Sequence, residues 1–338
     1  MASASIVVVT HGHRAEMERL LPSLEAQMRP EDELIVVDNA SSDGTADYVS
    51  SSSGAGLIRR ATNSGFAAAA NEGAAAATRD LFVLLNPDVV VERGFRDAIE
   101  RPLEDDRAWD LWMGLVTLED GERINTSGGA VHYTGLAWAG RTGRPLAEAP
   151  AERVDVGFAS GACLAMPLER WRALGGFSPE FFMYCEDVDL SLRVRLGGGR
   201  VGIEPAARVR HDYEFAKGAL KWRLLERNRW ALVLRTYPTP LLVALLPALA
   251  ATELAIVAAA ASQGWLGQKL RAMADLARAL PRLLRERREI QAGRAVSVEE
   301  FAESLTPDLD SPFLGAPARW PMVGTLVQVY WRGVRRVL

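Results

Sequence analysis

Cysteine is scarce in this sequence: its 338 residues include only Cys163 and Cys185. The two form neither a CxxC pair nor the spacing of a metal-binding cluster, which excludes a disulfide-stapled scaffold and a cysteine-ligated metal site. Isolated thiols of this kind are expected to be reduced and partly buried, in a reducing compartment.

Three further features are absent. No basic segment precedes the first apolar run, residues 6–9, which is too short for a signal-peptide core, so we expect the catalytic part to stay on the cytoplasmic side. No charge excess indicates a nucleic-acid partner, because the formal net charge is -4. No internal repeat is present. A hydrophobic content of 49% in a chain of this length instead predicts a large folded domain with an appendage.

Strand and helix patterns alternate in the first half. Apolar runs predict strands at 6–9, 34–37, 57–58 and 81–85, and helical spacing predicts helices at 17–24, from 43–45 onward, and at 67–78. This alternation favours a doubly wound parallel sheet. We expect hairpins and loops over 109–153. A strand at 158–166, helices at 168–174 and 186–195, and a last strand at 201–203 follow.

Polar residues end three of the predicted strands: Thr10, Asp38-Asn39 and Asn86-Pro87-Asp88. Ligands of an open α/β sheet bind at the carboxyl ends of its strands, so these residues are expected to converge. Asp38 is suited to accept a hydrogen bond from a base or a ribose. Asp43, by contrast, is expected to shape the turn before the next helix.

Two segments indicate phosphate and metal chemistry. Asn63-Ser64-Gly65-Phe66 enters an Ala-rich helix, where small residues let the backbone approach a phosphate or sugar, although a capping Asn63 explains the pattern equally well. Asp88 follows a proline at a strand end. It is placed to hold Mg²⁺ or Mn²⁺, whose remaining ligands would be diphosphate oxygens; a simple strand-end turn is the alternative.

A candidate general base lies further along. Glu186, Asp187 and Asp189 follow an aromatic segment at the start of a predicted helix. Acids suit the helix dipole, but three of them exceed what a cap requires, so one carboxylate is a candidate base for an acceptor hydroxyl. His211, beyond the next strand, is by itself more typical of a structural histidine.

These residues together resemble the family 2 glycosyltransferases with a GT-A fold, especially their rhamnosyltransferase-like branch. The resemblance covers about the first two-thirds of the chain. The matching segments, in order, are 7–10, 36–45, 63–67, 85–88, 161–164 and 184–193.

The resemblance implies a GT-A type doubly wound mixed sheet and a role for each site residue. Thr10, Asp38 and Asn63 would line the nucleotide pocket, to which we add their neighbours Asn39, Gly65 and Asn86. Asp88 and His211 would bind the metal, Asp187 would be the catalytic base, and Glu186 would lie beside it. Asn86 stands where other relatives have the first acid of the metal motif, which leaves fewer carboxylates for the metal.

The C-terminal third differs in composition. We expect residues 1–217 to form the GT-A catalytic domain and 218–338 a helical region. Residues 226–230 resemble the Gln-x-x-Arg-Trp element of processive synthases, but one apolar stretch, 241–261, cannot supply their several membrane helices. The chain is therefore interpreted as non-processive.

The stretch 241–261 is long enough to span a bilayer but contains Pro247 and Glu253. We therefore expect an interfacial hairpin broken near Pro247 and, with the basic stretch 265–290, binding to the inner face of the cell membrane. The alternatives are a soluble appendage and a homo-oligomer interface.

The predicted activity is inverting transfer of a sugar from a nucleotide-diphosphate donor to a hydroxyl of a glycan or polyprenyl-linked acceptor. The resemblance suggests dTDP-L-rhamnose as donor, with UDP-sugars as the alternative. The competing hypothesis is a catalytically weak nucleotide-sugar-binding or scaffold subunit of a glycan assembly complex.

Overall fold

The computed structural model describes residues 2–104, 109–211, 218–311 and 320–338. Their contacts separate two compact units. The N-terminal unit comprises the described residues of Met1–Gly129, Ala139–Val194 and Gly199–Tyr213, and the C-terminal unit those of Ala130–Trp138, Arg195–Gly198 and Glu214–Leu338. The predicted boundary at 217/218 adjoins 212–217, which lie outside the described residues, and it stays a prediction.

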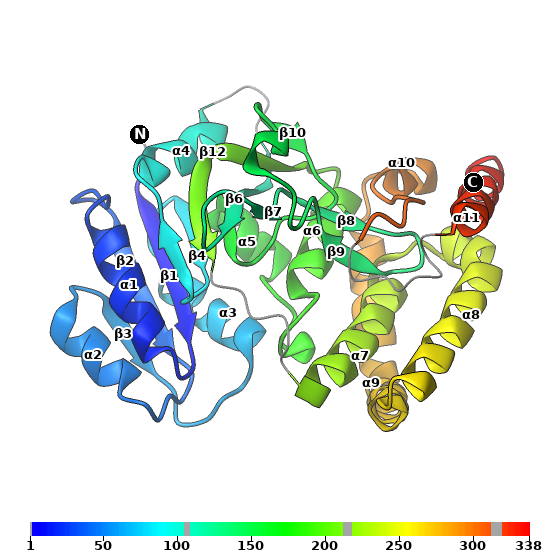
Figure 1. Cartoon of the computed structure of the whole chain (residues 1–338), viewed down its shortest axis with the longest axis horizontal. Coiled ribbons are helices and arrows are strands. Elements are labelled where there is room, and N and C mark those ends of the chain that lie inside the picture. The colour runs from blue at the N-terminus through cyan, green and yellow to red at the C-terminus, as the bar shows by residue number, and fades with distance from the viewer. Residues whose placement is uncertain (1, 105–108, 212–217, 312–319) are drawn as a thin grey trace. The chain divides into compact units, whose positions relative to one another are not determined.

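A mixed sheet forms the centre of the N-terminal unit (Figure 1). Over the described residues ten strands join it, in the order β10-β12-β6-β11-β4-β1-β2-β3, with β5 beside β12 and β7 beside β6. The strands are β1 (Ala4–Thr10), β2 (Glu33–Asp38), β3 (Gly56–Arg59), β4 (Leu81–Leu85), β5 (Val89–Val91), β6 (Leu111–Leu118), β7 (Ile124–Thr126), β10 (Val154–Asp155), β11 (Cys163–Pro167) and β12 (Val201–His211). The expected mixed sheet is thus confirmed: β4, β1, β2 and β3 run parallel, and β11 is antiparallel to β4 and β6.

Helices flank this sheet. They are α1 (Arg14–Glu25), α2 (Thr45–Ser52), α3 (Phe66–Ala76), α4 (Phe95–Glu100), α5 (Leu168–Leu174) and α6 (Glu186–Leu196). The small residues of α3 have a packing reason: a Cβ on Gly73 would lie 2.4 Å from Val7 Cγ1 of β1. The helix therefore approaches the sheet more closely than larger residues would allow.

Three expectations for this unit need correction. The hairpins and loops predicted for 109–153 contain β6, a fully integrated strand, because Leu111–Leu118 is a buried apolar run between β11 and β12. The strand expected at 158–166 begins only at Cys163. The short strand expected at 201–203 continues to His211, since β12 pairs with both β6 and β5.

The C-terminal unit is helical. Its helices are α7 (Gly218–Thr236), α8 (Thr239–Ser262), α9 (Leu266–Ala292), α10 (Val298–Glu303) and α11 (Pro321–Arg335), and the short strands β8 (Gly129–Val131) and β9 (Ala137–Ala139) pair with each other. Among the described residues α8 is the one helix long and apolar enough to cross a membrane, and 17% of its apolar window is buried.

The hairpin predicted near Pro247 is wrong, because α8 is one continuous helix. A proline removes a backbone donor and weakens the preceding turn. Within that turn the Ala244 carbonyl also accepts a hydrogen bond from the Tyr330 hydroxyl of α11 at 2.6 Å.

Candidate active site

The ends of β1 and β2 hold the predicted nucleotide-binding side chains. Thr10 and Asp38 are register partners, and both are buried. Within the described part of the chain, neither Thr10 Oγ1 nor Asp38 Oδ1 has a hydrogen-bond partner. Buried polar atoms are normally satisfied, so two unsatisfied oxygens at one strand edge are consistent with a site for a polar ligand.

Asn39 connects these strand ends to the loop before α3. Its backbone N–H donates to the Thr10 carbonyl at 2.8 Å, and its side-chain Nδ2 donates to Asn63 Oδ1 at 2.9 Å and to the Gly65 carbonyl at 3.2 Å. Asn63 Oδ1 also accepts from the Gly65 N–H at 2.9 Å. Asn63 therefore shapes the loop through its side chain. Asn39, Asn63 and Gly65, which are predicted to bind the nucleotide-sugar donor, lie together.

Asp43 plays the turn-forming role expected of it. Its carboxylate accepts from the backbone N–H of Thr45 at 3.1 Å and of Arg14 at 3.0 Å. Together with the Thr45 hydroxyl, these donors hold its pKa below the usual range.

Asp88 and His211 are brought together although 123 positions separate them: His211 Nε2 lies 2.9 Å from Asp88 Oδ1. The antiparallel pairing of β5 with β12 sets His211 opposite Val89, the residue after Asp88. One carboxylate and one imidazole suit Mn²⁺ somewhat better than Mg²⁺, which prefers oxygen ligands throughout. No group of three potential metal-ligating residues exists among the described residues, so a metal here would need ligand oxygens from the donor.

The candidate base, Asp187, is the second residue of α6. Its Oδ2 accepts from the Gly161 N–H at 3.0 Å, and its Oδ1 accepts from the Val188 N–H at 2.8 Å. Burial raises the pKa of Asp187, although these two donors oppose the shift. Each carboxylate oxygen retains a further lone pair, so the fixed group can still accept an acceptor hydroxyl proton.

Glu186 and Asp189 have different environments. Glu186 is buried; burial and then the neighbouring Asp187 raise its pKa well above the usual range. Such a carboxyl is favoured in its neutral form, which makes it the weaker candidate for a base. Asp189 forms a buried ion pair with Arg193 at 2.8 Å, and Arg193 also donates to the Gly176 carbonyl, so Asp189 anchors α6.

Two backbone connections join the three groups. The Asn86 N–H donates to the Ala162 carbonyl at 3.1 Å, next to the Gly161 that holds Asp187. On the other side, the Phe182 carbonyl accepts from the Ala67 N–H at 3.1 Å, at the start of α3 after Gly65. The loop before α3, residues 63–65, the strand end that carries Asp88 and the start of α6 that carries Asp187 are therefore linked.

Phe182 was not among the predicted site residues. It has a positive φ of 61°, and Tyr184 and Cys185 follow at 71° and 66°. Non-glycine residues with positive φ are uncommon and gather at functional sites. The aromatic run was visible in the sequence, but nothing in residue type announces this backbone conformation.

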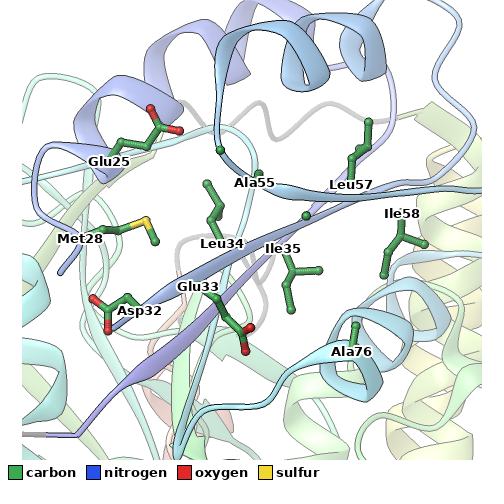
Figure 2. A pocket seen from close by; sticks show the side chains of 12 residues that line it. Glu25, Met28, Asp32, Glu33, Leu34, Ile35, Ala55, Leu57, Ile58 and Ala76 are labelled. Atoms are coloured by element: carbon green, nitrogen blue, oxygen red, sulfur yellow. The ribbon is translucent and has the colours of Figure 1, made fainter. Parts of the chain in front are cut away.

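A separate hollow lies at the opposite ends of β2 and β3. Figure 2 shows the side chains that line it, from the end of α1, the starts of β2 and β3, and the end of α3. Because β2 and β3 are parallel, this hollow is remote from Asp38 at the carboxyl end of β2. Three acids line it, Glu25, Asp32 and Glu33, and two of them are engaged elsewhere, Asp32 with Arg96 and Glu33 with Thr78. The hollow forms no part of the candidate site.

Comparisons with known proteins identify the class to which the chain is similar. Residues 5–127 match the profile of the family described as "Glycosyl transferase family 2". The N-acetylglucosaminyl-diphospho-decaprenol L-rhamnosyltransferase of Mycobacterium tuberculosis (strain CDC 1551 / Oshkosh) is 28% identical over 240 residues, which are 63% of this chain and 77% of that protein. The rhamnosyltransferase WbbL of Escherichia coli (strain K12) is 25% identical over 251 residues, 67% of this chain and 91% of that protein.

Among solved structures, GalNAc-T7 with UDP, GalNAc and Mn2+ superposes with a TM-score of 0.58 at 17% identity, covering 72% of this chain and 50% of that one. This chain thus spans half of that protein, and the likeness concerns the fold. The matches define the class: the chain has the GT-A fold of glycosyltransferases. It carries a family 2 glycosyltransferase domain and is rhamnosyltransferase-like.

Proposed function

We propose that this chain is an inverting, metal-dependent glycosyltransferase that uses a nucleotide-diphosphate sugar, with dTDP-L-rhamnose as the first donor to test. The observation that carries the proposal is the linked geometry of Asp187, Gly161 and the Asp88–His211 pair. Transfer of a sugar from a nucleotide diphosphate requires a positioned base and a group that holds the metal. The Asp187 carboxylate and the Asp88–His211 pair are suited to these two roles.

In the proposed reaction an acceptor hydroxyl loses its proton to an Asp187 oxygen. The hydroxyl oxygen forms a bond to the anomeric carbon on the face opposite the diphosphate, whose bond to that carbon breaks and which leaves with the nucleoside. Asp88 and His211 would hold Mg²⁺ or Mn²⁺, which neutralises charge on a diphosphate. Thr10, Asp38 and the loop ordered by Asn39 would hold the nucleotide.

The direct test compares Asp187→Asn with Glu186→Gln. Asp187→Asn is expected to lose about 10²–10⁴-fold in turnover, the usual contribution of a general base, while donor affinity by calorimetry stays near wild type. Glu186→Gln is the matched control, since it removes the adjacent carboxyl and is expected to keep most activity. The opposite ranking would make Glu186 the base. Wild-type protein that binds donor but shows neither transfer nor donor hydrolysis with Mn²⁺ or Mg²⁺ would support a binding subunit instead.

We further propose that the acceptor is lipid-linked and that the enzyme works at the cytoplasmic membrane surface. The Mycobacterium relative is named for a decaprenol-linked substrate, and α8 exposes an apolar surface, with Leu246 59% and Leu254 72% exposed. Soluble proteins rarely leave such a surface uncovered. Flotation with vesicles tests this, and a protein that stays in solution while forming a dimer would support the oligomer alternative.

A further inference from the structure

A hollow of about 330 Å³ lies in the C-terminal unit where α8 begins. It is lined by Thr239 and its flanking prolines from α8, and by Arg287, Arg288, Gln291 and Arg294 from the end of α9 and just beyond. Three arginines therefore line one hollow, and no acidic residue lines it.

The arginines are ordered by backbone rather than by acids. Arg287 donates to the carbonyls of Leu234 and Tyr237, each at 2.7 Å, and Arg294 donates to the Val296 carbonyl at 2.9 Å. Arg288 is exposed. Over the described residues, none of the three arginines has a carboxylate within ion-pair distance, so no protein acid neutralises their charge.

Guanidinium groups pair with phosphate oxygens with high geometric specificity. The chemistry that fits this hollow is a phosphate ester.

An apolar surface continues from the same end of α8. Val243 is 60% exposed one turn after Thr239, and Leu246 and Leu254 follow on exposed positions. Helix α11 packs against α8 (Figure 1) and exposes Met322 and Leu326. An exposed apolar surface that begins at a phosphate-binding hollow matches the order of headgroup and acyl chain in a lipid.

We propose that this hollow binds the phosphate of an anionic membrane lipid, and that the exposed face of α8 and α11 enters the headgroup–acyl boundary beside it. Helix α8 then lies in the plane of the membrane. It does not cross, because its one acid, Glu253, is held within the unit by Lys269, Arg229 and Trp230. The proposal deepens the membrane-surface part of the proposed function, but its test uses neither donor nor acceptor, so a chain without transferase activity would still bind.

The test is flotation of the full-length protein with phosphatidylcholine vesicles, with and without phosphatidylglycerol. Arg288→Gln/Arg294→Gln is compared with Arg271→Gln/Arg285→Gln, which removes two arginines from α9 positions that do not line the hollow. A basic residue near an anionic surface contributes about fivefold in partitioning, so we expect about 25-fold weaker binding for the first variant and a much smaller loss for the second. Equal losses would show diffuse attraction and overturn the site.

Two further arms identify the source of the phosphate and the role of the apolar face. Inorganic phosphate should compete with vesicle binding more strongly than chloride at equal ionic strength. Phosphate that stabilises the protein thermally, without any vesicle binding, would assign a soluble ligand and overturn the lipid. Val243→Gln should weaken vesicle binding, whereas Val154→Gln on β10, 42% exposed, is the control and should not. Loss of binding with the control alone would refute the assignment of the face.

Discussion

Lys269→Met is the most severe test of how the C-terminal unit is built. Lys269 Nζ lies 2.5 Å from Glu226 Oε2 and 2.6 Å from Glu253 Oε1, and its side chain is 1% exposed. Arg229 lies 2.7 Å from the same Glu253 and 3.2 Å from Glu226. Two cations thus balance two carboxylates among α7, α8 and α9.

Methionine would keep the apolar stem of Lys269 and remove only its charge. Two carboxylates would then share one guanidinium in a buried site. Removal of one partner from a buried ion pair costs about 3–5 kcal/mol in the free energy of unfolding, because the remaining charge stays desolvated. The expected loss is therefore of this size and not the few tenths typical of a surface lysine.

Urea unfolding followed by tryptophan fluorescence measures the change, since the Trp230 indole donates to Glu253 at 2.9 Å within the cluster. Arg278→Met is the matched control, because Arg278 pairs with Asp275 at 2.9 Å while its side chain is 75% exposed. The double variant Lys269→Met/Glu226→Gln restores charge balance and should recover much of the stability. A single variant within about 1 kcal/mol of wild type, or a double variant no better than the single, would refute the reasoning.

Four other outcomes are expected. Burial alone would raise the pKa of Glu253, but hydrogen bonds from Lys269 and Trp230 lower it. The contribution of Glu253 to stability is therefore present above the ordinary pKa of 4.5 and is lost as the pH falls through the lowered pKa. A melting temperature that does not fall on acidification would contradict this. Gly65→Ala would set a Cβ 2.5 Å from the Phe182 carbonyl oxygen at a φ of +90°. This variant should lose about 2–5 kcal/mol in the free energy of unfolding and bind the sugar donor more weakly. The control Gly54→Ala, whose Cβ meets nothing within 4 Å, should change neither the thermal shift nor the calorimetric affinity. Asp88→Ala should weaken metal-dependent donor binding more than His211→Ala, and equal wild-type affinity with and without metal would exclude the metal role. Because burial raises the pKa of Asp187 and the base must be ionised, kcat/KM should fall with falling pH at a value above the ordinary 3.8, and a limb at or below that value would argue against Asp187.

Much of the fold could be predicted wherever structure follows from local pattern. Strands β1, β2 and β4 are buried on both faces, so they appear as continuous apolar runs with polar residues at their carboxyl ends. The proximity of Thr10 and Asp38 could be predicted for the same reason, because the sheet itself brings strand ends together. Helix α3 was recognisable from its small residues, which the contact between Gly73 and Val7 requires.

Features that depend on distant partners could not be predicted from the residues alone. Strand β6 stands among Gly-rich turns in the sequence, and its place between β11 and β12 is set by pairing with segments some fifty to ninety positions later. The position of His211 beside Asp88 follows from the β5–β12 ladder, and only the family resemblance suggested it. The positive φ of Phe182 occurs where its carbonyl accepts a hydrogen bond from the Ala67 N–H, more than a hundred positions earlier.

Glu253 shows how such distant partners change a functional conclusion. In the sequence, an acid within an apolar run predicts a penalty on membrane insertion and, with Pro247, a broken hairpin. That penalty assumes a carboxylate facing lipid. In the structure the Glu253 carboxylate pairs with Arg229 of α7 and Lys269 of α9. Part of the basic stretch expected to meet lipid headgroups therefore binds groups within the unit: Lys269 pairs with Glu253, and Arg287 donates to backbone carbonyls. The exposed side of α8 is left without charge. For the proposed membrane association, a charged anchor on one side of α8 and an apolar surface on the other favour a helix that lies on the membrane over one that crosses it. The proposed lipid phosphate would then be recognised at the end of the helix rather than along it.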